Sequence, residues 1–160
     1  MTSLILVDVD GVLNPSTPSP DYVKHTISVY ETTYSVHLNP AHGQWLKDLA
    51  AKTDSQLVWC TYWEKNAPKS IAPVLGLPEM PVIPMKLWKM GCSLGAEKAY
   101  SAMQYVGIDT KFAYFDDEWD INAFLGKNGK HIWVDPEYGL TEKHIEAAEE
   151  YLMRYKYEQN

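Results

Sequence analysis

Two aspartates separated by a single residue follow the first apolar run of the chain. The run at residues 4–7 stops at Asp8, and Asp10 and Gly11 come directly afterwards. Alternate residues of an extended segment point the same way, so both carboxylates can face one pocket before Gly11 allows a sharp exit. Paired acids suit a hard divalent cation, and they also suit a nucleophile working beside a general acid/base. A strand that merely ends in an acidic turn is the structural alternative.

Other polar residues close later apolar runs in the same manner. Thr61 follows the run at 57–60, and Asp116 and Asp117 follow the run at 112–115. If these runs are parallel strands, their carboxyl ends meet at one edge of a sheet, where such folds bind ligands. A calcium-binding loop at Asp8 is excluded, because the glycine and the distal glutamate of that motif are missing at their offsets.

The elements that must position these side chains alternate between strand and helix. Unbroken apolar runs predict strands buried on both faces, whereas apolar spacing of three and four predicts helices. The sequence therefore predicts an α/β fold, a single Rossmann-like doubly wound parallel sheet. The predicted strands are 3–7, 57–60, 112–115 and 131–134, with a short one at 82–83; the predicted helices run from Asn39 to Lys52, from about Trp63, from 93 to 105 and from Thr141.

A small insertion separates the first strand from the first helix. Residues 14–21 contain three prolines and form a predicted loop, and residues 26–38 are rich in β-branched and aromatic side chains. A two-stranded flap is predicted there, with residues 31–33 near the middle of the segment. We expect one domain over residues 1–160, with the flap insertion at about 14–38 and no large cap domain.

Composition bounds the cellular setting and the partners. A chain of 160 residues with 46% hydrophobic residues is long enough for one core. The formal net charge of -7 argues against broad adhesion to nucleic acid or to an anionic membrane, although a local basic groove is compatible with it. Cys60 and Cys92 give no disulfide framework, and no apolar run is long enough for a membrane span. A cytoplasmic protein without a membrane or protein partner is expected.

The opening motif resembles that of a known superfamily. Residues 4–13, which read L-I-L-V-D-V-D-G-V-L, are similar to the first motif of phosphatases of the haloacid dehalogenase (HAD) superfamily. This resemblance implies that Asp8 is the nucleophile and a Mg²⁺ ligand. It also implies that Asp10 binds Mg²⁺ through its backbone carbonyl, while its side chain protonates the leaving group and then activates water.

The resemblance extends to the later strand ends. Thr61 corresponds to the second motif, in which a hydroxyl and nearby N–H groups bind the phosphate, and a helix beginning just after it would direct further N–H groups there. Asp116 corresponds to the fourth motif as the expected metal ligand, with Asp117 supporting it and Asp120 as a weaker candidate. The sequence departs from the commoner Gly-Asp-x-x-x-Asp form, so the division of work among these three acids stays open.

The third motif of the superfamily is a lone lysine that neutralises the nucleophile and the phosphate. Lys98, near the start of the predicted helix 93–105, is the first candidate for this catalytic and substrate-binding role. Lys86 and Lys89, in the preceding loop, remain alternatives. Tyr62 follows Thr61 and is expected to contact the substrate, and Trp63 and Asn66 are expected to line the same pocket.

Together these motifs imply an Mg²⁺-dependent phosphomonoester hydrolase that acts through an aspartyl phosphate. The motifs are 53 and 55 residues apart, which leaves no room for a large cap and should leave the site open to bulky substrates. The opening D-V-D-G-V-L-N at residues 8–14, together with V-W-C-T-Y-W-E-K-N-A at residues 58–67, is also similar to small HAD domains of RNA-repair proteins and of polynucleotide kinase–phosphatases. The expected substrate is a phosphorylated small molecule or, as this narrower resemblance implies, a nucleic-acid end. The alternatives are a polynucleotide-end phosphatase and a catalytically silent phosphate-binding module.

Overall fold

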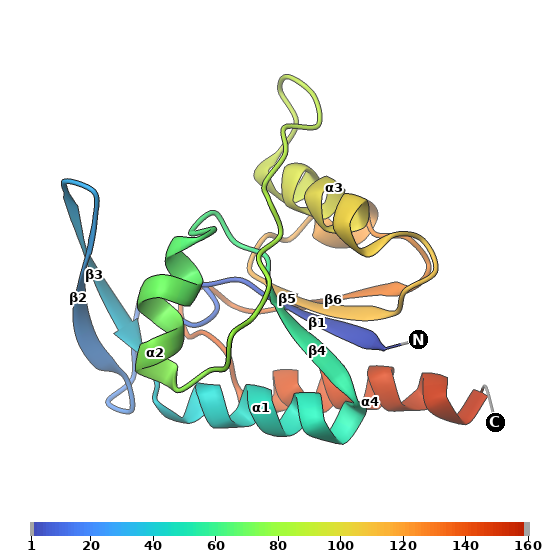
Figure 1. Ribbon diagram of the computed structural model, residues 1–160, viewed down its shortest axis with the longest axis horizontal. Helices are drawn as coiled ribbons and strands as arrows, with labels where there is room; N and C mark the ends of the chain where they lie inside the picture. Colours follow the sequence, from blue (N-terminus) through green and yellow to red (C-terminus); the bar gives the residue numbers. More distant parts are fainter. Residues whose placement is uncertain (1, 159–160) are drawn as a thin grey trace.

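A parallel sheet of four strands forms the centre of the computed structural model (Figure 1), which describes residues 2–158, with side chains as far as Arg154. Its spatial order is β4-β1-β5-β6, with every neighbouring pair parallel. The predicted α/β fold with a doubly wound parallel sheet and no large cap is confirmed. The strands are β1 (Ser3–Val7), β4 (Ser55–Trp59), β5 (Phe112–Asp116) and β6 (Gly129–Trp133).

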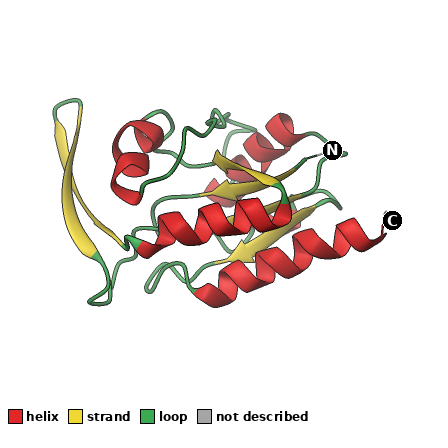
Figure 2. Ribbon diagram, turned by 60° about the horizontal axis from the view of Figure 1, so that its bottom comes forward, coloured by secondary structure: helices red, strands yellow, loops and turns green. Residues whose placement is uncertain are grey.

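Helices cover both faces of this sheet, which explains why its strands are apolar without alternation. Helices α1 (Ala41–Thr53) and α4 (Glu142–Glu158) lie side by side on one face, and α3 (Leu94–Val106) lies on the other (Figure 2). Ile5 and Val7 of β1 pack into the core under α1 and α4. Leu6 between them packs into the core under α3.

The order of the strands places a switch point beside β1. From β1 the chain continues to β4 on one side of it, and it then returns to β5 on the other side. Loops leaving the carboxyl ends of β1 and β5 therefore diverge, and they leave a crevice where such folds bind ligands. Asp8 immediately follows β1, and Asp116 is the last residue of β5.

The flap is a separate antiparallel hairpin of β2 (Val23–Val29) and β3 (Thr32–Leu38). It projects from the side of the molecule opposite to the two chain ends (Figure 1). Its turn lies next to residues 31–33, the middle of the predicted flap. Val29 pairs with Thr32, so the turn residues are Tyr30 and Glu31, and Tyr30 adopts a φ of 54°.

The helix expected to open around Trp63 or Glu64 is present but begins a few residues later. Residues 61–65 form successive tight turns, and helical structure begins only with the π-helix Ala67–Ile71, which runs into α2 (Ala72–Leu75). Pro68 explains the delay, because proline cannot donate the i→i−4 hydrogen bond and is accepted only in a first helical turn. The position of Pro68 in the sequence therefore indicates the later start of the helix.

The strand predicted at residues 82–83 is reduced to a single bridge on the outer edge of β4. Trp59 donates its N–H to the Pro81 carbonyl at 2.9 Å, and its own carbonyl accepts from Ile83 at 2.9 Å. Within the described residues, no helix combines the length and the apolar character needed to cross a membrane.

Candidate active site

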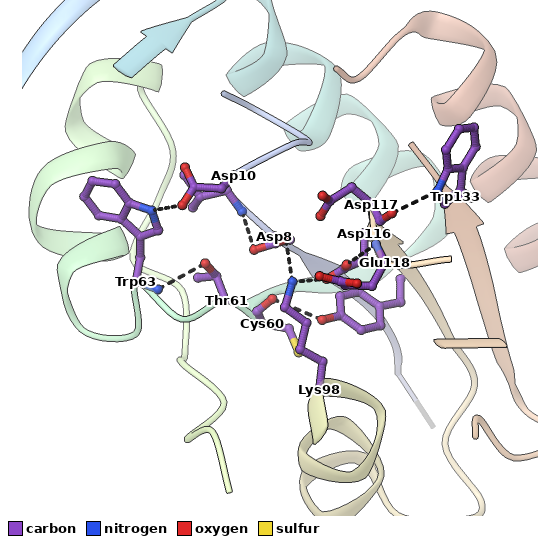
Figure 3. Close-up of polar contacts among 12 residues, drawn as sticks. Asp8, Asp10, Cys60, Thr61, Trp63, Lys98, Asp116, Asp117, Glu118 and Trp133 are labelled. Atoms are coloured by element: carbon purple, nitrogen blue, oxygen red, sulfur yellow. Dashed lines mark hydrogen bonds and ion pairs between the residues drawn. The ribbon is translucent and has the colours of Figure 1, made fainter. Parts of the chain in front are cut away.

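A buried lysine joins the two acids at the switch point (Figure 3). Lys98 Nζ donates to Asp8 Oδ2 at 2.8 Å and to Asp116 Oδ2 at 2.9 Å. Asp8 and Lys98 are 3% and 5% exposed, and Asp116 is fully buried. Charged groups are rarely buried to this degree unless they are paired, and breaking such a pair is costly. The three side chains therefore form one electrostatic unit built from β1, β5 and α3.

The local charges do not balance. Burial and the neighbouring charge of Asp116 raise the pKa of Asp8 well above its ordinary value, although Lys98 opposes this. Burial alone would lower the pKa of Lys98, but the charges of Asp8 and Asp116 outweigh it and raise that pKa. Two carboxylates thus share one ammonium group, and the site carries surplus negative charge.

A third carboxylate enlarges this surplus. Oxygen atoms of Asp8, Asp116 and Asp117 all lie within 4.8 Å of one another. Burial and the Asp116 charge raise the pKa of Asp117 as well. Gly11 makes room for it, because a Cβ at Gly11 would lie 2.5 Å from an Asp117 oxygen, and the φ of 77° at Gly11 also favours glycine. The residues present fit a hard divalent cation, whose usual ligands are carboxylate oxygens.

Asp120 has a different role from these three acids. It does not belong to the carboxylate cluster identified among the described residues; its Oδ2 accepts a hydrogen bond from Ser93 Oγ, the N-cap of α3. A Cβ at Gly95 would overlap an Asp120 oxygen, so this carboxylate packs against the first turn of α3. Asp120 therefore supports the helix that carries Lys98.

Of the three candidate lysines, Lys98 is the one whose ammonium group reaches Asp8. Lys86 and Lys89 lie exposed in the loop before α3, and Lys89 Nζ sits 4.7 Å from the centroid of the Trp88 ring. Ser93 caps α3 by accepting from the Ala96 N–H at 3.0 Å, which sets the helix start and so the direction of Lys98.

Asp10 lies beside this cluster but makes other contacts. It is exposed, its Oδ1 accepts from Asn14 Nδ2 at 3.0 Å, and its Oδ2 accepts from the Trp63 indole N–H at 2.8 Å. Its side chain is thus separated from the buried unit although only one residue lies between Asp8 and Asp10. The two aspartates have different environments, which is what a nucleophile and a separate general acid/base require.

Thr61 is buried at the end of β4, next to the β1 end that carries Asp8 (Figure 3). Its hydroxyl oxygen accepts from the Trp63 N–H at 3.2 Å, so the tight turn replaces the expected helix end. Tyr62 is 43% exposed, and the centroid of its ring lies 5.9 Å from Lys98 Nζ. Both residues therefore border the predicted site.

A cleft opens between the flap and the turn after Thr61. Its volume is about 290 Å³, and Asp10 lies in its wall. Aromatic rings from both sides meet there, since the ring centroids of Tyr34 on β3 and Trp63 are 5.6 Å apart. The remaining lining is apolar or neutral, and it consists of Asn14, Val29, Ser35, Val36, Tyr62 and Asn66.

Sequence reasoning overlooked two of these residues. Asn14 falls in the predicted proline-rich loop, and its place four residues after Asp10 is a signal for a local side-chain contact. Tyr34 was assigned to the flap without a functional role. Its proximity to Trp63 depends on how the hairpin folds back, which no local spacing reveals.

The sheet order, the strand-end acids and the buried lysine define the class of protein to which this chain belongs, a HAD-type phosphatase. More particularly, residues 4–145 match the family described as the HAD domain in Swiss Army Knife RNA repair proteins, and the chain belongs to that family. The resemblance identified from the opening motif is confirmed by this match, and so is the enzyme class.

Several solved structures are similar to this chain at low sequence identity. A putative HAD superfamily (subfamily III A) hydrolase from Legionella pneumophila is 16% identical with a TM-score of 0.48, over 96% of this chain and 82% of that one. A hypothetical protein from Xanthomonas campestris is 16% identical with a TM-score of 0.49, over 98% of this chain and 88% of that one. The 3-deoxy-D-manno-octulosonate 8-phosphate phosphatase from Yersinia pestis is 12% identical with a TM-score of 0.47, over 96% of this chain and 81% of that one. No curated protein matches significantly.

Proposed function

We propose that this chain is an Mg²⁺-dependent phosphomonoester hydrolase that acts through an aspartyl phosphate on Asp8. The observation that carries the proposal is the buried unit of Asp8, Lys98 and Asp116 at the switch point, with Asp10 two residues from Asp8 in a different environment. A purely structural acidic turn would have no reason to bury three charged side chains together.

The metal is assigned to the carboxylate cluster. Asp8, Asp116 and Asp117 would hold Mg²⁺, with the backbone carbonyl of Asp10 as a further expected ligand. When bound, the ion would supply charge neutralisation for the phosphoryl group and bring it close to the nucleophile. Burial first, and then the charge of Asp116, raise the pKa values of Asp8 and Asp117. A divalent cation bound between these carboxylates would favour their ionised forms.

The residues of the chain divide the reaction into two steps. An oxygen of Asp8 attacks phosphorus, the bond from phosphorus to the ester oxygen breaks, and Asp10 gives its proton to the departing oxygen. Asp10 then takes a proton from water, which attacks the phosphorus, breaks the acyl phosphate bond and releases inorganic phosphate. Lys98 and the Thr61 hydroxyl stabilise the phosphoryl oxygens throughout in this proposal.

Rapid-quench trapping tests this proposal. Wild-type enzyme mixed with radiolabelled aryl phosphate and Mg²⁺ should form an acid-stable, hydroxylamine-sensitive phosphoenzyme. Asp8→Asn should form none while keeping the fold, because the change is nearly isosteric. Full turnover in Asp8→Asn would remove the nucleophile assignment, and no turnover of any ester by the wild type would favour a silent phosphate-binding module.

A nucleic-acid end is the second candidate for the substrate, and one surface feature favours it. A hollow of about 280 Å³ beside the aromatic cleft is lined by Tyr30, Lys65 and Lys69, with Lys65 Nζ 5.9 Å from the centroid of the Tyr30 ring. Lysines beside aromatic rings suit a single strand, whose phosphates and bases they contact. The family name, which refers to RNA repair proteins, supports the same candidate.

Lysine variants test this candidate. Lys65→Ala and Lys69→Ala should each lower kcat/KM for 3′- or 5′-phosphorylated oligonucleotides and reduce its salt dependence, yet leave an aryl phosphate unaffected. Equal kcat/KM for an oligonucleotide in the wild type and both variants would favour a small-molecule substrate instead.

A further inference from the structure

The Asp10 carboxylate is tied to the flap through both of its oxygens. Asn14 Nδ2 donates to Oδ1, and Asn14 Oδ1 in turn accepts from the His37 N–H on β3 at 2.9 Å. Trp63 Nε1 donates to Oδ2, and the Trp63 ring lies against Tyr34, also on β3. Each oxygen of Asp10 is therefore one side chain away from the same strand of the flap.

We propose that Asn14 and Trp63 are positioning residues through which the β2–β3 flap fixes the orientation of the Asp10 carboxylate. The inference rests on the proposed function, because it assigns Asp10 the proton transfers. Asn14 and Trp63 act through Asp10 and are not assigned any contact with the reacting atoms. The flap is then part of the catalytic apparatus as well as a cover.

An exposed aspartate would otherwise rotate freely about its side-chain bonds. Proton transfer to a leaving oxygen needs a carboxyl group at hydrogen-bond distance and in the correct direction, and small misplacements are costly. Two donors that approach different oxygens restrict this rotation. An indole N–H only donates, and the side-chain amide of Asn14 donates to Asp10 through its nitrogen, so neither group competes as a base.

The residues that make these contacts also line the aromatic cleft. Asp10, Asn14, Tyr34 and Trp63 all contribute to its wall, and the lining side chains apart from Asp10 carry no charge. A leaving group that enters the cleft therefore touches the side chains that orient the acid. The flap and the departing part of the substrate meet at Trp63.

The kinetic test separates leaving groups by their need for a proton. Trp63→Phe keeps an aromatic ring against Tyr34 but removes the N–H donor, and Asn14→Leu removes both hydrogen bonds of that side chain. Each variant should lower kcat/KM for alkyl phosphates by about tenfold, a fraction of the usual general-acid contribution. For an aryl phosphate with a good leaving group, kcat/KM should stay within about twofold, since little protonation is needed.

A double-mutant cycle distinguishes positioning from a structural role. In an Asp10→Asn background, Trp63→Phe should cause no further loss with alkyl phosphates, because the group that it orients is already gone. Trp88→Phe, a tryptophan outside the cleft, is the matched control and should leave both substrate series unchanged. Equal losses on alkyl and aryl esters, or a loss that persists without the Asp10 carboxyl, would overturn the inference.

A spectroscopic test needs no turnover and so separates this inference from the proposed function. The indole ¹H–¹⁵N signal of Trp63 is identified by its loss in Trp63→Phe. It should move upfield in Asp10→Asn, where the acceptor loses its charge, and it should shift in Tyr34→Ala, while Trp88 keeps its signal in both. If no ester is hydrolysed but these shifts occur, the proposed function fails and the link from flap to Asp10 stands; a Trp63 signal that is unchanged in Asp10→Asn overturns the link.

Discussion

Burial gives individual residues of this site properties that their types alone do not. Lys98 is shielded from water and held by two carboxylates, whereas Lys86 and Lys89 are exposed in a loop. A buried lysine such as Lys98 is already desolvated and oriented, so it interacts with a phosphoryl group more strongly than a solvated lysine does. The ammonium group of a buried lysine thus interacts more strongly with a charged ligand than the same group on the surface.

Replacement of these lysines should show the difference directly. Lys98→Met keeps most of the side-chain volume and should lower kcat by about 100-fold or more, as removal of a preorganised charge does. Lys86→Ala and Lys89→Ala should remain within about twofold of wild type. Steady-state kinetics with an aryl phosphate measure these changes, and circular dichroism checks the fold. A larger loss of kcat in Lys89→Ala than in Lys98→Met would show that Lys89 of the loop, and not Lys98, neutralises the phosphate.

His42 shows the opposite effect of burial, on a group outside the site. Its side chain on α1 is fully buried, and neither ring nitrogen makes a hydrogen bond of ordinary geometry within the described residues. Burial lowers the pKa of His42 to about 4, although the backbone of Leu140 partly opposes the shift. The folded protein therefore holds this ring neutral where an unfolded chain would protonate it.

This pKa predicts how stability depends on pH. Between about pH 6.5 and 4 the unfolded chain binds more protons at His42 than the folded protein does. The contribution of His42 to the free energy of unfolding is therefore fully present above pH 6.5 and is lost as the pH falls to about 4. The loss is on the order of 3 kcal/mol. Urea unfolding of wild type and His42→Phe from pH 7.5 to 4 measures this loss. The free energy of unfolding of the wild type should fall relative to that of His42→Phe as the pH falls, and a constant difference between the two free energies would contradict the pKa.

At the scale of elements, close contacts between helices hold the loops that carry the site. Gly43 on α1 faces α2, and a Cβ there would lie 1.8 Å from the Leu75 carbonyl oxygen. Helix α2 closes the segment that begins at Thr61, so its contact with α1 fixes the far end of that segment. Only glycine permits this approach.

Substitution at this contact should affect stability more than helix propensity predicts. Gly43→Ala raises helix propensity, but it forces α1 and α2 apart and should destabilise the protein by about 1–3 kcal/mol. Gln44→Ala, an exposed change on the same helix, should stay within about 0.5 kcal/mol. Free energies of unfolding from urea titrations decide it, and a stabilised Gly43→Ala would show that the helices are not in contact there.

The elements also show what the sequence could and could not reveal. The strands were predictable because runs such as residues 4–7 are buried on both faces, and the strand ends then located Asp8 and Asp116. The helix after Thr61 begins later than expected because Pro68 fits only the first helical turn. Contacts such as Trp63 with Asp10 join residues 53 positions apart and depend on tertiary packing, so no local pattern indicates them.

For the whole molecule, stability should be distributed unevenly. The central sheet is packed between helices on both faces, whereas most residues of the two flap strands are exposed. A two-stranded hairpin is marginal without a packed face. The part of the molecule that covers the site is therefore the part that opens most readily.

Hydrogen exchange should reveal this difference. Amides of β1 and β5 should exchange only with global unfolding, while those near the flap turn at Tyr30 should exchange orders of magnitude faster. Mass spectrometry of peptides after timed labelling measures both regions in one sample. Equal protection of the flap and the sheet would indicate a rigid cover and a site with restricted access.

The bridge at Val82 also bears on how copies of this chain behave at high concentration. An uncovered outer strand exposes unpaired backbone groups to which another molecule can add. Here the backbone of Trp59 is already bonded to Pro81 and Ile83, and Pro81 and Pro84 flank a segment too short to continue as a strand. Proline offers no N–H for a further ladder, so this short segment shields the Trp59 end of the β4 edge from self-association.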